Sequence, residues 1–171
     1  MSALLRPAAP EDAAEMLRFL RSTAAETEYL LRTPEEWTLT ESEERELLAG
    51  ALEDPRRTIL AGFIQGELAG IGSVNPTGAQ RRVRHRCSLA LVVRASCWGL
   101  GLGRGMLTTL CGLACDMGYM QAELEYVEGN ARARSLYERC GFVATGRFPR
   151  ATRYDDGRCA DDIFMVKLLK P

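Results

Sequence analysis

The stretch Leu89-Ala-Leu-Val-Val-Arg94, followed closely by Trp98-Gly-Leu-Gly-Leu-Gly-Arg-Gly105, decides the fold of this chain. The apolar run predicts a buried strand, and apolar residues at helical spacing from Met106 onward predict a helix. Glycine lets backbone N–H groups approach a ligand closely and adopt positive φ, and a helix N-terminus carries partial positive charge. A strand, a glycine loop and a helix N-terminus in this order are typical of a phosphate-binding site.

The spacing of the glycines excludes the two common nucleotide-binding loops. A Walker loop ends in Gly-Lys-Ser or Gly-Lys-Thr, and neither occurs in this chain. A dinucleotide fingerprint needs Gly-x-Gly-x-x-Gly, but its third glycine would fall on Arg104 or on Met106. The loop therefore predicts a phosphate ligand of another kind.

Length and composition limit the class of protein. The chain has 171 residues, 46% hydrophobic and 26% charged, with a formal net charge of −1. These values fit one soluble domain over residues 1–171, without the basic excess of a nucleic-acid-binding module. No apolar run reaches membrane-spanning length and no signal-peptide core is present, so we expect a cytoplasmic protein that binds neither nucleic acid nor membranes. Six cysteines without a CxxC pair, and a single histidine, favour reduced thiols and no metal site.

The remaining sequence predicts alternating strands and helices, a mixed α/β (α+β) class. Gln65-Gly-Glu67 predicts a hairpin turn, and Asn130 predicts a helix N-cap. Strands are expected at about 3–6, 58–64, 68–74, 82–93, 121–127, 142–148 and 160–168. Helices are expected at about 10–20, 42–52, 106–117 and 131–140.

A second motif follows the glycine loop. The segment from Asn130 to Phe142 reads Asn-Ala-Arg-Ala-Arg-Ser-Leu-Tyr-Glu-Arg-Cys-Gly-Phe and matches the pattern N-x-x-A-x-x-L-Y-x-x-x-G-F. Together with the glycine loop, it resembles the GCN5-related N-acetyltransferase (GNAT) superfamily. The family's pyrophosphate motif, Gln/Arg-x-x-Gly-x-Gly/Ala, maps onto Trp98–Gly103, with Trp98 in place of the polar residue. Thr33–Glu36, His85 and Asp161 add a resemblance to bacterial amino-acid and small-amine acetyltransferases.

This resemblance implies a fold and a co-substrate. The fold is a mixed, mostly antiparallel sheet of six or seven strands flanked by about four helices. It is splayed between the strand at 85–93 and the strand at 121–127, with a bulge near 91–93. The co-substrate is acetyl-CoA, and no metal is required. The resemblance implies that acetyl-CoA is bound by residues of the strand, the glycine loop and the second motif. These are Leu91, Val92, Val93, Arg94, Trp98, Gly99, Leu100, Gly101, Leu102, Gly103, Arg104, Asn130, Ala133, Tyr137 and Arg139. For each of these arginines, a solvated surface charge is the alternative.

The resemblance also assigns a general acid. Tyr137 would protonate the departing thiolate, if the site narrows the gap between a phenol pKa of about 10 and a thiol pKa of about 8.5. The alternative is that Tyr137 is only a packed core aromatic. The general base stays open, because Ser88 occupies the position of the glutamate that some relatives use. Glu125, His85 and a water chain are the candidates.

The acceptor substrate is expected to lie between the first two helices. Residues 26–46 contain eight glutamates and two arginines, which favours a cationic amine unless the glutamates only solvate helix faces. Glu28, Glu36 and Trp37 are the expected contacts. The expected reaction is transfer of an acetyl group to the primary amine of a small molecule, either an amino acid or a polyamine-like compound. The alternatives are a ribosomal-protein or other protein N-terminal acetyltransferase, and a non-catalytic acyl-CoA-binding domain. Relatives often dimerise, so a homodimer is also open.

Overall fold

A seven-stranded sheet organises the protein, and the computed structural model describes residues 3–169 of it. The strand order is β1-β2-β3-β4-β5-β7-β6, and every neighbouring pair is antiparallel except β4 with β5. The strands are β1 (Ala3–Pro7), β2 (Thr58–Ile64), β3 (Glu67–Pro76), β4 (Arg86–Val93), β5 (Gln121–Val127), β6 (Val143–Arg153) and β7 (Cys159–Leu168). The expected mixed, mostly antiparallel sheet is confirmed.

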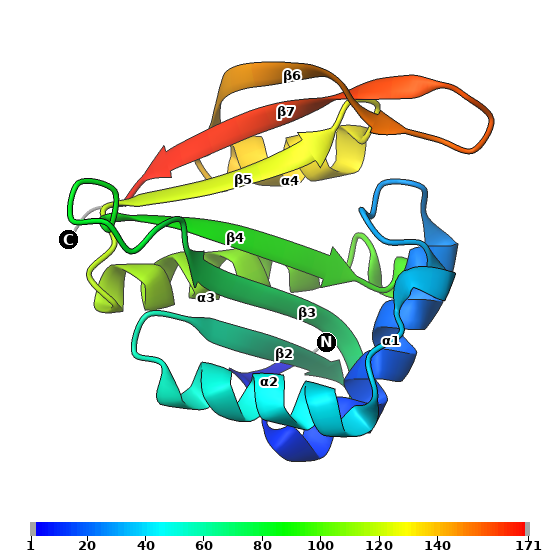
Figure 1. Ribbon diagram of the computed structural model, residues 1–171, viewed down its shortest axis with the longest axis vertical. Helices are drawn as coiled ribbons and strands as arrows, with labels where there is room; N and C mark the ends of the chain where they lie inside the picture. Colours follow the sequence, from blue (N-terminus) through cyan, green and yellow to red (C-terminus); the bar gives the residue numbers. More distant parts are fainter. Residues whose placement is uncertain (1–2, 170–171) are drawn as a thin grey trace.

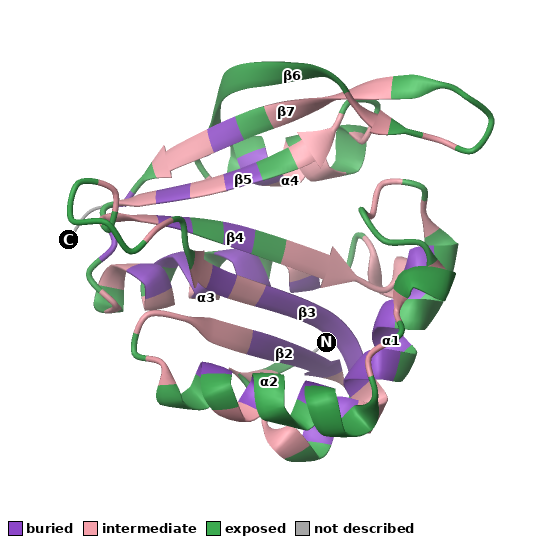
Figure 2. Ribbon diagram, in the orientation of Figure 1, coloured by how far each residue is buried: buried purple, intermediate pink, exposed green. Residues whose placement is uncertain are grey.

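Helices cover both faces of this sheet (Figure 1). They are α1 (Ala13–Glu26), α2 (Glu41–Glu53), α3 (Leu102–Asp116) and α4 (Ala131–Arg139), with short 3₁₀ turns at Pro10–Asp12, Pro34–Glu36 and Ala95–Cys97. One core lies between α1, α2 and the first strands, around Phe19, Leu48 and Phe63. A second core lies on the other face around α3, where Met106 and Leu110 are fully buried. Figure 2 shows that buried residues concentrate in α1, α3 and the central strands, whereas β6 is mostly exposed.

The parallel strands β4 and β5 separate part of the way along their length. They pair only from Arg86 with Gln121 to Ser88 with Glu123, although β4 continues to Val93 and β5 to Val127. Beyond this point each strand follows its other neighbour: β4 stays paired with β3, and β5 stays paired with β7. The expected splay between these strands is confirmed, and it opens toward the segment that follows α1 (Figure 1).

The expected bulge near residues 91–93 is wrong. β4 pairs with β3 in continuous register from Cys87 to Val93. The register shift of this part of the sheet lies between β2 and β3, where Gly62 pairs with Gly70 and Phe63 with Leu68, so that Ala69 of β3 is the extra residue. The splay therefore comes from the separate partners of β4 and β5 and needs no irregularity within β4.

Several element boundaries also differ from the expectation. The first helix continues to Glu26 instead of ending near Leu20, and β6 continues to Arg153 instead of ending near Phe148. The third helix begins at Leu102 instead of Met106, because Gly101 adopts a left-handed φ of 86° and turns the chain into the helix. β4 begins at Arg86 instead of near Arg82, because the amides of Val83 and Arg84 donate to the carbonyl of Gln80 and form a turn. Within residues 3–169, no helix combines the length and apolar character that crossing a membrane requires.

Candidate active site

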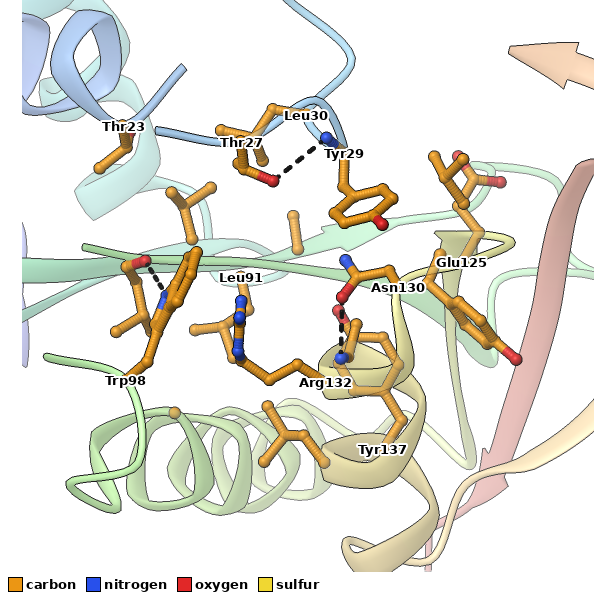
Figure 3. Close-up of a pocket in the computed structure, with 18 of the residues that line it drawn as sticks. Thr23, Thr27, Tyr29, Leu30, Leu91, Trp98, Glu125, Asn130, Arg132 and Tyr137 are labelled. Carbon is orange, nitrogen blue, oxygen red and sulfur yellow. Dashed lines mark hydrogen bonds between the residues drawn. The ribbon is translucent and has the colours of Figure 1, made fainter. Parts of the chain in front are cut away.

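A cavity of about 730 Å³ lies where β4 and β5 separate. Figure 3 shows side chains from the segment after α1, β4, the glycine loop, β5 and α4 converging on it. Its volume is in the range of ligand pockets, which is about 300–1,000 Å³. The expected residues that line it are Leu91, Val92, Val93, Trp98, Gly99, Gly101, Gly103, Arg104, Glu125, Asn130, Ala133, Tyr137 and Arg139.

The backbone of β4 presents alternate amides to this cavity. The amide of Arg94 donates to the carbonyl of Ala69 in the segment of β3, at 3.0 Å, so Arg94 faces β3. Successive residues of a strand direct their N–H and C=O groups to opposite sides. Val92 therefore also faces β3, whereas Leu91 and Val93 face the side from which β5 has departed. The expectation that all of residues 91–93 offer amides is corrected: Val92 contributes only its side chain.

The glycines of the loop serve different purposes. Gly99 and Gly101 have φ of 78° and 86°, and a Cβ at either position would meet open space. Left-handed backbone conformation, not lack of room, therefore requires glycine at both positions. Gly103 lies within α3, where a Cβ would be 3.3 Å from Leu136 Cδ2, and Gly105 lies within α3 facing open space. Only the first two glycines shape the loop itself.

The N-terminus of α3 offers unpaired amides beside the cavity. The amide of Gly105 donates to the carbonyl of Gly101 at 3.0 Å, which is the first helical hydrogen bond. The amides of Leu102, Gly103 and Arg104 precede this bond and have no acceptor within the helix. Such a group of amides binds anions. The side chain of Leu102 is buried in the core, so this residue can act only through its backbone.

Helix α4 brings Asn130 and Tyr137 to the cavity. Asn130 Oδ1 accepts a hydrogen bond from the amide of Ala133 at 3.1 Å, which confirms Asn130 as the N-cap and fixes the start of the helix. Tyr137 is only 8% exposed and packs between Tyr126 and Phe142, with ring centroids 6.3 and 6.2 Å away. Burial raises the pKa of Tyr137 to about 12, so the phenol stays protonated at neutral pH.

Glu125 lies on β5 beyond the last pair with β4 and lines the cavity. Partial removal of water by the cavity wall raises the pKa of this carboxyl, and the carboxylate of Asp162 raises it further. Asp162 also lines the cavity, and its Oδ1 accepts a hydrogen bond from Thr152 Oγ1 at 3.1 Å. Asp162 was not predicted from the sequence, because the only signal near it pointed to Asp161.

The segment that follows α1 forms a roof over the cavity. We call residues 26–31 the roof segment; Thr27, Tyr29, Leu30 and Leu31 of this segment line the cavity. On the β4 side, Glu26 Oε2 accepts a hydrogen bond from the amide of Ala95 at 2.6 Å. On the β5 side, the Tyr29 hydroxyl donates to the carbonyl of Gly129 at 3.2 Å. The roof segment is thus attached to the chain after β4 and to the chain after β5. We call the gap where these two strands separate the β4–β5 split.

A further contact extends this attachment to the β6–β7 hairpin. Glu28 forms an ion pair with Arg158 at 3.0 Å, so Glu28 points toward the hairpin and does not line the cavity. The carboxylate of Glu36 caps its own 3₁₀ turn by accepting from the amide of Thr33 at 2.8 Å. Trp37 packs beneath the guanidinium of Arg32, 4.7 Å from the ring centroid. The three residues expected to bind the acceptor therefore lie outside the cavity.

Four other expected residues also lie outside it, one of them the buried Leu102 described above. His85 precedes β4, at the end opposite the split, and its carbonyl accepts from the amide of Met120 at 2.9 Å. Arg94 extends over the ring of Phe19, 5.5 Å from its centroid. The side chain of Leu100 is 53% exposed. None of these side chains lines the cavity.

Arg132 is a cavity residue that the sequence analysis missed. It is the second residue of α4, and its guanidinium lies 3.3 Å from the ring centroid of Trp98 (Figure 3). The indole Nε1 of Trp98 donates to the carbonyl of Val93 at 2.7 Å. This stack links the glycine loop to α4 across the cavity. The only feature of the sequence that could have indicated Arg132 as a cavity residue was its position within the Asn130–Phe142 motif.

Comparisons with known proteins agree with this geometry. A model of the acetyltransferase (GNAT) family matches residues 22–142. A GNAT-family acetyltransferase from Streptococcus pneumoniae is 30% identical, with a TM-score of 0.93 and coverage of 98% of this chain and 99% of that one. No curated protein matches the chain.

Two further solved structures share the fold at lower identity. A ribosomal-protein-alanine N-acetyltransferase from Brucella melitensis is 23% identical, with a TM-score of 0.85 and coverage of 97% of this chain and 99% of that one. A phosphinothricin acetyltransferase from Sinorhizobium meliloti, solved in complex with acetyl-CoA, is 19% identical, with a TM-score of 0.85 and coverage of 99% and 89%. Because the family model covers most of the chain and the pneumococcal relative matches nearly all of it, this protein belongs to the GNAT acetyltransferase family and is an acyltransferase.

Proposed function

We propose that the protein transfers an acetyl group from acetyl-CoA to the primary amine of a small molecule. The observation that carries this proposal is one roofed cavity that joins two kinds of wall. One wall consists of unpaired amides and the basic residues Arg104, Arg132 and Arg139. The other wall contains the carboxylates of Glu125 and Asp162. Glu26 and Arg153 also line the cavity, so the separation concerns these two clusters and not every charge. The three arginines suit an anionic donor, and the two neighbouring carboxylates suit a cationic amine.

The first wall fits the donor. The amides of Leu102, Gly103 and Arg104 at the start of α3 would hold the pyrophosphate. The amides of Leu91 and Val93 would bind the pantetheine arm and the thioester carbonyl, where the oxyanion develops during attack. The acetyl-CoA complex of the Sinorhizobium relative supports the same donor for this chain.

Tyr137 is proposed as the general acid. Its pKa of about 12 keeps the proton on the phenol at neutral pH, and burial widens the gap between this pKa and the thiol pKa of about 8.5. The same removal of water also destabilises a thiolate, as the buried thiol of Cys87 illustrates with a pKa raised to about 12. A thiolate that loses water beside the buried phenol would gain basicity for the same reason, which favours transfer of the phenolic proton.

Glu125 is proposed as the general base. Its carboxylate is accessible from the cavity, and its pKa is raised above the usual glutamate range. A raised pKa makes the carboxylate a better proton acceptor for an ammonium substrate, either directly or through one water. His85 lies too far along β4 to share this role.

The roof segment favours a small acceptor. A protein N-terminal acetyltransferase needs an open groove for a polypeptide, whereas residues 26–31 are attached on both sides of the split. The likeness to the Brucella enzyme, at 23% identity, extends to the fold alone. A non-catalytic acyl-CoA-binding domain would have no need of Tyr137 and Glu125 in the same cavity.

An amine screen tests this function. Thiol release from acetyl-CoA would be followed with amino acids and polyamines on one side and peptides with free N-termini on the other. We expect release with at least one small amine and none above background with peptides. Release with peptides alone would replace the proposal by protein N-terminal acetylation. Tight acetyl-CoA binding without release for any acceptor would leave the non-catalytic function.

A further inference from the structure

The contact between Trp98 and Arg132 is not explained by folding alone. The two residues lie on different elements, Trp98 before the glycine loop and Arg132 at the start of α4, and both line the donor wall. The guanidinium is stacked 3.3 Å from the indole centroid. Trp98 stands where the family motif has a polar residue, so the chain lacks the polar group expected at that point.

Trp98 itself has no group left for a ligand. Its single polar atom, Nε1, already donates to the carbonyl of Val93 at 2.7 Å. This bond anchors the indole to the end of β4. The ring is therefore a fixed surface, and its exposed feature is the face that Arg132 covers.

Arg132 differs from the other arginines of α4. Arg134 forms an ion pair with Glu138 at 2.8 Å, and Arg139 donates to Ser135 Oγ at 2.7 Å. Among the residues that the structure describes, Arg132 has neither a hydrogen-bond partner nor an ion-pair partner for its guanidinium, unlike Arg134 and Arg139. Stacking uses only the face of a guanidinium, and its N–H donors remain in the plane at the edge. Arg132 is thus a positioned cation with unused donors, and it lines the same cavity as Gly103 and Arg104 at the start of α3.

We propose that Trp98 is a platform that positions Arg132 to bind the pyrophosphate of the donor. In this arrangement the positive group comes from α4 and the indole fixes its orientation. Arg132 would bind two phosphate oxygens through its edge while the amides of Gly103 and Arg104 bind others. Trp98 is a positioning residue, and Arg132 is a binding residue. The inference rests on the proposed function, because it requires acetyl-CoA as the donor.

Binding measurements on single and double variants test the proposal. Calorimetric Kd values for CoA would be compared in the wild type, Arg132→Ala, Trp98→Ala and the double variant. A lost charge-assisted contact weakens binding about tenfold or more. We expect this loss in Arg132→Ala, a similar loss in Trp98→Ala, and almost no further loss in the double variant, because both substitutions remove the same contact.

Matched controls separate this role from a structural one. Arg134→Ala removes the same charge from the same helix outside the cavity and should leave the Kd unchanged. Trp98→Phe keeps a ring face for Arg132, loses only the Nε1 bond and should bind more tightly than Trp98→Ala. This variant also keeps the test valid if Trp98→Ala fails to fold.

Truncated donors identify the phosphate involved. Dephospho-CoA keeps the pyrophosphate and should show the same loss in Arg132→Ala, whereas the KM for S-acetylpantetheine, which has no pyrophosphate, should not change. Wild-type affinity in Arg132→Ala, or losses in the two single variants that multiply in the double variant, would overturn the proposal. Loss of the effect with dephospho-CoA would also overturn it. If the wild type binds no CoA, the proposed function itself fails.

Discussion

The two halves of the cavity are built in different ways. The half that we propose for the donor consists mainly of backbone: unpaired amides of β4 and α3, shaped by Gly99 and Gly101, which have positive φ, with Trp98 and Arg132 beside them in the lining. The acceptor half consists of side chains from segments far apart in sequence, such as Tyr29, Glu125 and Asp162. A backbone cradle is encoded by a continuous motif, whereas a side-chain wall depends on how distant elements pack. Apart from the Trp98–Arg132 pair, the donor half should therefore tolerate side-chain changes and resist backbone changes, and the acceptor half should behave in the opposite way.

The largest expected effect lies where the two halves meet. Tyr137→Phe keeps the packed ring and removes only the proposed acid, so kcat should fall by about 10²–10⁴ while the Kd for acetyl-CoA stays the same. Steady-state kinetics and calorimetry measure the two quantities separately. An unchanged kcat would assign Tyr137 to packing alone.

The second effect concerns proton removal in the acceptor half. Glu125→Gln should lower kcat/KM by about 10²-fold, because the proposed base is lost. In the wild type, kcat/KM should rise with pH through the pKa of Glu125, which burial and Asp162 place above the usual glutamate range. Asp162→Asn removes a negative charge near Glu125 and so favours the ionised form of Glu125. The rise of kcat/KM with pH should therefore shift to lower pH. A shift to higher pH, or no shift, would exclude Glu125 as the titrating base.

A pair of glycine substitutions tests the donor half. Gly101→Ala forces a side chain into a left-handed conformation at a cost of about 1–3 kcal/mol, so acetyl-CoA should bind about tenfold more weakly. Gly105→Ala is the matched change at a helical position that faces open space, and it should raise stability by about 0.5–1 kcal/mol without weakening binding. Thermal unfolding and calorimetry provide both measurements. Equal losses of affinity in the two variants would contradict a backbone cradle.

The smallest effect is expected in the roof segment. Glu28→Gln removes the exposed ion pair with Arg158, which contributes at most about 1 kcal/mol. The KM for the amine should rise about two- to threefold, and the Kd for acetyl-CoA should not change. Glu41→Gln breaks a similar exposed pair with Arg45 on α2 and serves as the control. A change in acetyl-CoA affinity alone would assign the roof segment to the donor half.

The same contrast explains what the sequence could predict. The strand, glycine loop and Asn130–Phe142 motif are local patterns, so the glycine loop before a helix and the cap at Asn130 were accessible from the sequence. The splay of β4 from β5 came only from the family resemblance that these motifs carry, and the bulge expected with it is absent from β4. The helix start was misplaced by four residues, because glycines inside α3 resemble loop residues. Expected acceptor contacts such as Glu28 and Trp37 were chosen from charge density and nearness along the chain. Their orientation is set by Arg158 and Arg32 instead, and nothing in the local sequence specifies those partners.

A crystal structure of the protein with acetyl-CoA tests the central claim most directly. The pyrophosphate should lie on the amides of residues 102–104 with the edge of Arg132 beside it, and the pantetheine arm should follow Leu91 and Val93. The thioester sulfur should be within about 3–3.5 Å of the Tyr137 hydroxyl, close enough for proton transfer. A donor bound outside the β4–β5 split, or a thioester beyond the reach of Tyr137, would contradict the proposed division of the cavity into a donor half and an acceptor half.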